Sequence, residues 1–137
     1  MTAEQNKALV RRVNKEYIEG RDESVAYELI ADDFTNCAAP ADSPRGPQAV
    51  IWFFDNIMRP AFSGIRVVIH EQVAEGDFVT TRKSFHATHK GEFFGVPATG
   101  REVTIDVIDM IRLHDGKFKE HWGIIDMPGI LAQIGSR

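Results

Sequence analysis

The spacing of the apolar residues changes once along this 137-residue chain, and that change constrains the fold more than any other feature. Up to about residue 60, apolar residues recur every three or four positions, which is typical of amphipathic helices. From Ile65 onwards they alternate with polar residues, which is typical of strands that bury one face. Helices followed by a run of strands predict an α+β fold, not an α/β fold of alternating elements.

The first half of the chain predicts short helices separated by turn residues. A first amphipathic helix over residues 3–19 ends at Gly20, a residue type that commonly stops helices. Asp22 can cap a second, shorter helix that carries apolar residues up to Ile30. Phe34 then begins a short extended segment.

A third helix and four strands complete the expected fold. Pro47 suits the first turn of a helix that ends near Pro60. A connection over residues 89–100 is rich in glycine and proline, and a closing helical turn follows over 128–134. The strands are expected over residues 65–70, 78–88, 101–113 and 118–126. We therefore expect one domain over residues 1–137, in which a cone-shaped, curved antiparallel sheet carries the N-terminal helices on its concave face, around a pocket for a small apolar ligand.

Charge and cysteine content narrow the possible partners. The formal net charge is −4 and no basic stripe stands out, so nucleic acid is not an expected partner. The only cysteine, Cys37, cannot form an intrachain disulfide, and we expect it to be a small buried residue. No stretch approaches the roughly 18 apolar residues of a membrane span, and the N-terminus lacks the pattern of a secretory signal. These features predict a cytoplasmic protein without a membrane partner.

Asp109 is the residue with the most chemical information. Strand alternation places it on the apolar face of the strand over 101–113, where an unpaired carboxylate costs roughly several kcal/mol. Its pKa is therefore open to large shifts, which suits a general acid or base. The alternative is a structural aspartate that accepts hydrogen bonds from the backbone or from an arginine such as Arg82 or Arg112.

Whether His121 joins Asp109 depends on the hairpin between the last two strands. A three-residue loop over 114–116 places both side chains on the same face, whereas a two-residue loop over 115–116 places Trp122 opposite Asp109. The sequence leaves both registers open. On the same face, the carboxylate and the imidazole would form a proton-transfer pair; otherwise His121 lies on the outer face or in a subunit contact.

Several other residues are candidates for the site. Asp126 ends the last strand, where it either caps the closing helix or takes part in catalysis. His86 and His89 are close in sequence, but no ligand cluster has fixed local spacing, so neither a metal nor another cofactor is predicted. The adjacent Phe93 and Phe94 could cover the mouth of the pocket or seal a dimer. The substrate-binding residues are expected to be Tyr17, Phe34, Trp52, Phe53, His89, Phe94, Val107 and Gly123.

Three segments resemble the SnoaL-like polyketide cyclases, also called ester cyclases, and the similarity extends over nearly the whole chain. They are Thr88–Arg101, Asp109–Trp122 and Asp126–Gly135. The resemblance implies the nuclear transport factor 2-like fold, a cystatin-like α+β barrel, and a homodimer formed through the outer face of the sheet. It also implies cofactor-free ring closure by intramolecular aldol condensation on an aromatic polyketide ester. In such enzymes an acidic side chain on the last strand moves protons while an apolar pocket stabilises an enolate.

The chain departs from this family pattern at the position of the catalytic acid. That position, two residues after the strand histidine, is Gly123, and the pocket histidine of the preceding strand is replaced by Asp109. One hypothesis is a cofactor-free isomerase or lyase in which Asp109 transfers protons next to a carbonyl and His121 orients it or shares its charge. Double-bond isomerisation, hydration or epoxide opening would need similar groups. The alternative, motivated by Gly123, is a non-catalytic module that binds a small apolar ligand.

Overall fold

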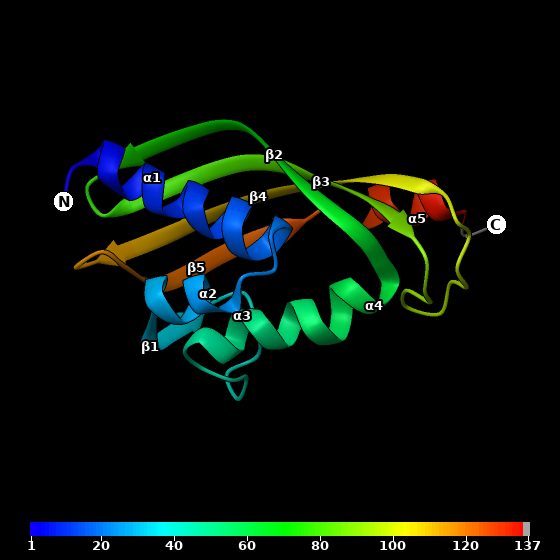
Figure 1. The fold of residues 1–137 in the computed structure, drawn as a ribbon, viewed down its shortest axis with the longest axis horizontal. Helices are drawn as coiled ribbons and strands as arrows, with labels where there is room; N and C mark the ends of the chain where they lie inside the picture. Colours follow the sequence, from blue (N-terminus) through cyan, green and yellow to red (C-terminus); the bar gives the residue numbers. More distant parts are fainter. Residues whose placement is uncertain (136–137) are drawn as a thin grey trace.

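The computed structural model describes residues 1–135, in which one curved sheet carries the N-terminal helices across one face (Figure 1). The strands lie in the order β1-β5-β4-β3-β2, and all neighbours are antiparallel except β1 and β5, which are parallel. Their bounds are β1 Ile30–Asn36, β2 Phe62–Glu75, β3 Phe78–His89, β4 Glu102–His114 and β5 Lys117–Ile125. The predicted α+β fold of a curved sheet with packed helices is confirmed.

The helices begin and end close to the predicted turn residues. Thr2 and Gln5 form a capping box at the first helix, which continues through a π-helical stretch to Glu19 and ends at Gly20 as predicted. Asp22 caps the second helix by accepting from the backbone N–H of Ser24 at 3.1 Å. The bounds are α1 Ala3–Arg12, η1 Val13–Glu19, α2 Glu23–Leu29, α3 Pro47–Phe53, η2 Phe54–Met58, α4 Arg59–Ala61 and α5 Met127–Ile134.

The boundary between α2 and β1 differs from the prediction. Ile30 was expected in the second helix, but it begins β1, so the extended segment starts before Phe34. Ile30 is fully buried and pairs with Phe118 of β5. A β-branched residue gains more from this sheet contact than from one further helical position, so tertiary packing decides the boundary.

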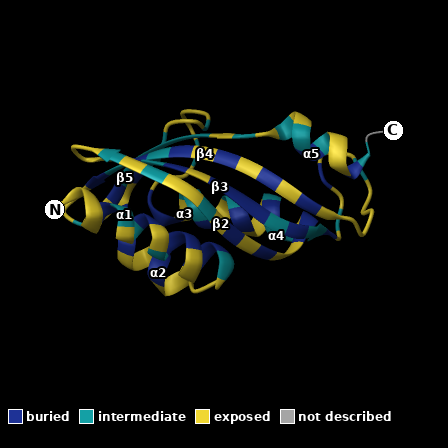
Figure 2. Ribbon diagram, turned by 90° about the horizontal axis from the view of Figure 1, so that it is seen from above, coloured by how far each residue is buried: buried dark blue, intermediate teal, exposed yellow. Residues whose placement is uncertain are grey.

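The four later strands were predicted correctly, and the ends of β3, β4 and β5 lie within one residue of the expected positions. β2 is the largest difference, since it covers Phe62–Glu75 where 65–70 was expected. Buried and exposed residues alternate along β3 and β4 (Figure 2). One face of the sheet therefore packs against the helices, and the other faces away from them.

The β4–β5 hairpin resolves the register that the sequence left open. Its turn has two residues, Asp115 and Gly116, and both have positive φ, as tight hairpin turns require. A β-bulge at Lys119 then shifts the pairing by one residue, so that Asp109 lies opposite Gly123. The expectation that a two-residue turn places Trp122 opposite Asp109 is therefore wrong. The bulge is the reason that His121 shares the inner face with Asp109.

Cys37 also differs from the prediction. Its side chain was expected to be buried, but it is exposed in the loop that follows β1. The backbone N–H of Cys37 donates to the carbonyl of His121 at 2.7 Å, so the backbone is fixed while the side chain points away from the core. Within residues 1–135, no helix is both long and apolar enough to span a membrane.

Candidate active site

A cavity of about 400 Å³ lies between the helices and the inner face of the sheet. This volume is within the roughly 300–1,000 Å³ typical of sites for small molecules. Its wall is mostly apolar, and five of the predicted substrate-binding residues line it: Phe34, Phe53, Phe94, Val107 and Gly123. Phe93 also contributes, and Phe94 is 67% exposed, so this aromatic pair reaches from the core to the surface at the cavity.

Four other predicted site residues lie outside the cavity wall. Tyr17 is buried in the core with its ring edge-on to Phe54, and Trp52 is half exposed on α3. His89 is fully buried beside the ring of Phe62, and its Nδ1 lies 3.0 Å from the Thr99 hydroxyl. Asp126 is the N-cap of α5 and accepts from the backbone N–H of Gly129 at 3.0 Å. Helical phase directs Tyr17 and Trp52 away from the cavity, and capping geometry does the same for Asp126. His89 is instead the last residue of β3, where its ring packs beside Phe62.

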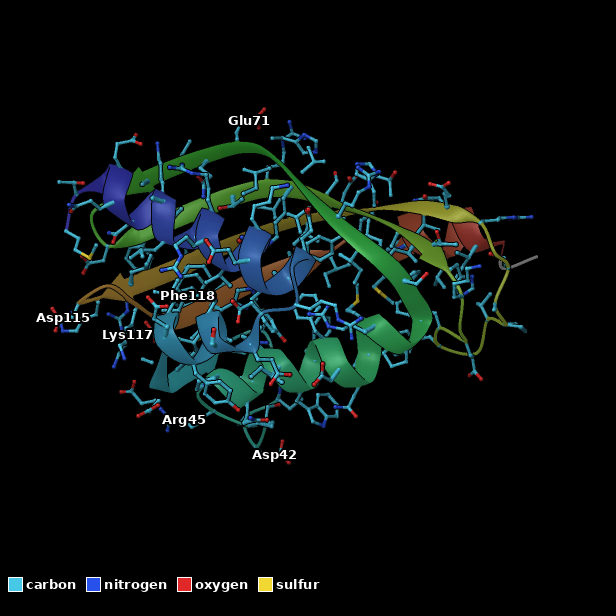
Figure 3. The ribbon with its side chains drawn as sticks, viewed as in Figure 1. Asp42, Arg45, Glu71, Asp115, Lys117 and Phe118 are labelled. Atoms are coloured by element: carbon cyan, nitrogen blue, oxygen red, sulfur yellow. The ribbon has the colours of Figure 1, made fainter. Side chains whose placement is uncertain are left out.

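Charged side chains are concentrated at the periphery of the molecule, as Figure 3 shows for Asp42, Arg45, Glu71, Asp115 and Lys117. Phe118, in contrast, is buried and lines the cavity. The few polar side chains that line the cavity therefore stand out as candidates for chemistry. They are Lys83, Asp109 and His121 from three adjacent strands, together with Asn14 of η1 and Asn36 of β1.

Lys83 and Asp109 form a buried ion pair. Lys83 lies opposite Val107 and Asp109 lies opposite Thr81, so the two charges occupy diagonal positions on the same face of β3 and β4. Lys83 Nζ is 3.0 Å from Asp109 Oδ2, and the two side chains are 4% and 8% exposed. Asn14 Oδ1 accepts a second hydrogen bond from Lys83 Nζ at 2.7 Å. The charges are thus paired, as burial requires.

His121 completes this group from β5. Its Nε2 lies 3.7 Å from Asp109 Oδ2, and its Nδ1 lies 3.0 Å from Asn36 Oδ1. Asn36 Oδ1 also accepts from the backbone N–H of Ala38 at 3.0 Å, which identifies that atom as the amide oxygen. An amide oxygen only accepts, so Nδ1 carries the hydrogen and the neutral ring leaves Nε2 as its basic atom.

Gly123 makes room for this arrangement. A Cβ atom at position 123 would lie 2.7 Å from Cε1 and Nε2 of His121 and 3.2 Å from Cβ of Asp109. Heavy atoms do not approach that closely without displacement. The imidazole ring of His121 therefore occupies the space into which a side chain at position 123 would extend.

The pKa of Asp109 is lowered to about 2. Burial by itself raises it, but the charge of Lys83 and the contacts with His121 outweigh the burial. Asp109 is therefore ionised at neutral pH. The alternative of an arginine partner is wrong, because Arg82 pairs with Glu71 and Arg112 pairs with Glu120.

This lowered pKa predicts how stability depends on pH. The pKa of the Asp109 carboxyl is lower in the folded state than its unfolded value, which is near 3.8. Such a group stabilises the fold at pH values above the unfolded pKa. That contribution, on the order of 2 kcal/mol, is lost as the pH falls from about 4 to about 2. In urea denaturation at a series of pH values, Asp109→Asn should be less stable than wild type at pH 7, and the gap should close towards pH 2. A gap of constant size would contradict the assignment.

The sequence prediction missed three polar residues of the site, which are Lys83, Asn14 and Asn36. A signal for Lys83 existed, because it alternates in phase with Val79 and Phe85 on the inner face of β3. Asn36 had none, because its place depends on the parallel pairing of β1 with β5. Within residues 1–135, no group of three or more histidine, cysteine or carboxylate side chains is gathered closely enough to hold a metal ion.

Comparisons with known proteins agree with this architecture. The model of the SnoaL-like polyketide cyclase family matches residues 8–134. The chain is 32% identical over 136 residues to aklanonic acid methyl ester cyclase DauD of Streptomyces sp. (strain C5), covering 93% of this chain and 80% of that protein. It is also 32% identical to the cyclase of the same name, DnrD, of Streptomyces peucetius, covering 93% and 88%. The crystal structure of IdmH from Streptomyces antibioticus superimposes with a TM-score of 0.82 at 29% identity, covering 96% and 99%.

Proposed function

This chain belongs to the SnoaL-like polyketide cyclase family, and from that premise we propose that it closes a ring in a hydrophobic polyketide ester by an intramolecular aldol reaction. The two relatives are named for aklanonic acid methyl ester, and we take esters of this kind as the substrate class. The observation that carries the proposal is the contact of His121 with the ionised Asp109 at 3.7 Å, in the wall of an apolar cavity.

His121 is the proton-transfer group in this proposal. Its Nε2 takes a proton from a carbon next to a carbonyl, and the resulting enolate carbon bonds to a second carbonyl carbon of the same molecule. The imidazolium then returns the proton to the new alkoxide, so the product is an isomer of the substrate. Nδ1 stays fixed on Asn36 throughout, which keeps the ring in place.

Asp109 and Lys83 support His121 without exchanging protons. A carboxylate with a lowered pKa is a weak base, so we reverse the roles that the sequence suggested for Asp109 and His121. Ionised Asp109 stabilises the imidazolium as it forms, and Lys83 holds the carboxylate in place. The apolar wall excludes water and thereby strengthens these charge interactions.

Replacement of Gly123 by alanine should lower activity while the fold is retained. The new methyl group meets the half-buried ring of His121, which can move, so the imidazole is displaced from Asp109. A displacement of about 1 Å can reduce turnover roughly 100-fold. Steady-state kinetics and thermal unfolding test this, with Gly76→Ala in the open β2–β3 turn as a control that should lower stability through its positive φ but leave turnover unchanged. Unchanged turnover by Gly123→Ala would contradict the role of this space.

The other parts of the proposal concern the whole protein. We propose one domain over residues 1–137, a cytoplasmic location, and a homodimer formed through the outer sheet face. Support for the dimer comes from exposed apolar side chains on that face: Val68, Val73, Phe78, Ile108 and Ile124. Sedimentation of wild type and of an Ile108→Lys variant tests the dimer.

The function is tested by incubating the purified chain, with a chelator and no added cofactor, with aklanonic acid methyl ester. Chromatography with mass spectrometry should detect a product of unchanged mass that has lost a free ketone. Binding of the ester without any product would instead favour a ligand-binding module for this compound.

A further inference from the structure

Strand β5 has a neighbour on both sides for only part of its length. β1 pairs with β5 as far as His121, whose carbonyl accepts from the backbone N–H of Cys37 at 2.7 Å. The chain then turns away from the sheet, and the N–H of Ala39 donates to the carbonyl of Asn36 at 3.1 Å. Beyond His121, the edge of β5 that faces away from β4 is therefore open.

The backbone N–H of Gly123 points to this open edge. Backbone groups of successive residues in a strand point to opposite sides, and the carbonyl of His121 points towards β1. The N–H of Asp126 points the other way and donates to the carbonyl of Asp106 on β4 at 3.0 Å, as the alternation requires. Gly123 follows His121 by two residues, so its N–H points to the side of β1, beyond the last residue that pairs there. Among residues 1–135, no backbone or side-chain group accepts a hydrogen bond from this N–H.

The cavity extends along the same edge. Gly123, Ile124 and Ile125 all line it, although successive side chains of a strand point to opposite faces. Consecutive residues share one cavity where that cavity reaches the edge of their strand. Ala38 and Ala39, where the chain has turned away from β5, line it as well. A group in the cavity can therefore accept a hydrogen bond from the Gly123 N–H.

This N–H lies beside the atom proposed to take the proton. A Cβ atom on Gly123 would be 2.7 Å from Nε2 of His121, so the backbone of Gly123 adjoins that nitrogen. Because glycine has no side chain, a ligand can approach its backbone closely. When Nε2 removes a proton next to a carbonyl, negative charge develops on the carbonyl oxygen, two bonds from the carbon that loses the proton. A fixed N–H donor in an apolar cavity is well suited to stabilise this charge.

We infer that the backbone N–H of Gly123 donates to the enolate oxygen of the substrate and is the oxyanion donor of the reaction. This assignment deepens the proposed function, on which it rests for the ring closure and for His121 as the base. The proton of the N–H stays on its nitrogen throughout, and the enolate electron pair forms the new carbon–carbon bond. Gly123 thus leaves space for the ring of His121 and also presents its own backbone to the substrate.

Two simple probes test this donor in binding alone. They are 4-nitrophenol, whose phenolate imitates the planar enolate, and its methyl ether 4-nitroanisole, each titrated into ¹⁵N-labelled wild type at a pH where the free phenol is ionised. In NMR spectra, the Gly123 amide proton should shift strongly downfield with the phenolate, because a charge-assisted hydrogen bond is short and strong, and only slightly with the ether. Ile124 is the internal control, because its N–H points towards β4 and should respond alike to both probes.

A backbone substitution tests the same donor in turnover. Glycolic acid in place of Gly123, introduced by peptide ligation, exchanges the N–H for an ester oxygen and adds no side chain. The kcat for aklanonic acid methyl ester should fall about 100- to 1,000-fold, the usual effect of removing one oxyanion donor, while KM changes little. The control is the all-amide chain assembled by the same ligation, and thermal unfolding checks that both chains fold. If the ester chain fails to fold, the amide shift in wild type decides.

Three results would overturn the assignment of Gly123. They are a Gly123 shift no larger with the phenolate than with the ether, no binding of 4-nitrophenol up to its solubility limit, and wild-type kcat in the ester chain. The two proposals can fail separately, because binding needs no turnover. Ring closure by the ester chain at the wild-type rate removes only the oxyanion donor. A selective Gly123 shift in a protein that closes no ring removes only the catalytic proposal.

Discussion

Replacement of His121 by alanine should lower the turnover of aklanonic acid methyl ester by about 10²- to 10⁴-fold, the usual contribution of a general acid–base group. The reason is that the basic Nε2 is lost, while Asp109 remains ionised by Lys83 and cannot replace it. Stability should change little, because the side chain is only partly buried and Asp109 keeps its lysine partner.

The control for His121→Ala is His86→Ala. His86 is also on a strand, but it faces outwards and contacts the Thr104 hydroxyl at 3.2 Å. This variant should retain wild-type turnover. Wild-type activity in His121→Ala, or equal losses in both variants, would exclude His121 as the proton-transfer group.

Replacement of Lys83 by methionine should destabilise the fold by about 3–5 kcal/mol, the usual effect of leaving a buried charge without its partner. Methionine fills nearly the same space, so the loss reports the uncompensated charge of Asp109 and not a cavity. Asn14 Oδ1 also loses its donor. Equilibrium urea denaturation at pH 7 measures the change.

A double variant identifies the origin of that loss. The double variant Lys83→Met with Asp109→Leu removes both charges. It should recover most of the stability that Lys83→Met loses, because replacing a buried ion pair by apolar residues often leaves the free energy of unfolding nearly unchanged. Lys119→Met is the matched surface control, since its partner Asp33 is well exposed, and it should change stability little. Two results would show that the ion pair is not a stabilising unit. One is a loss of unfolding free energy in Lys83→Met no greater than that in Lys119→Met, and the other is no recovery of stability in the double variant.

Local sequence signals were sufficient for most of the fold. Three helix ends lie where they were predicted, at Gly20, Asp22 and Pro47. Each of these residues acts through its own backbone or capping chemistry. Strand alternation correctly placed Asp109 on the inner face. Ile30 was misplaced because its environment is set by β5, which lies far away in the sequence.

The site was less predictable because it depends on contacts between strands. The bulge at Lys119 decides that His121 faces Asp109, and no residue type at that point requires a bulge. Lys83 was overlooked because a lysine between polar neighbours reads as solvent-exposed. Asn36 reaches His121 only through the parallel β1–β5 pair.

The departure from the family pattern now has a physical interpretation. An acidic side chain at position 123 and the observed ring position of His121 are mutually exclusive, because both need the same space. With glycine there, the imidazole reaches the aspartate of the preceding strand. We therefore propose that the acid–base function has moved from position 123 to His121, and that Gly123 is a requirement of the new arrangement.

Proton transfer by His121 is tested most directly by hydrogen exchange into aklanonic acid methyl ester in heavy water. Mass spectrometry would follow deuterium uptake at the carbons next to its ketones, in the presence of wild type and of His121→Ala at equal concentrations. Uptake with wild type should be at least about 100 times faster than with the variant. Uptake at the same rate with both proteins, or none above the protein-free rate with wild type, would contradict the central claim that His121 transfers protons in this cavity.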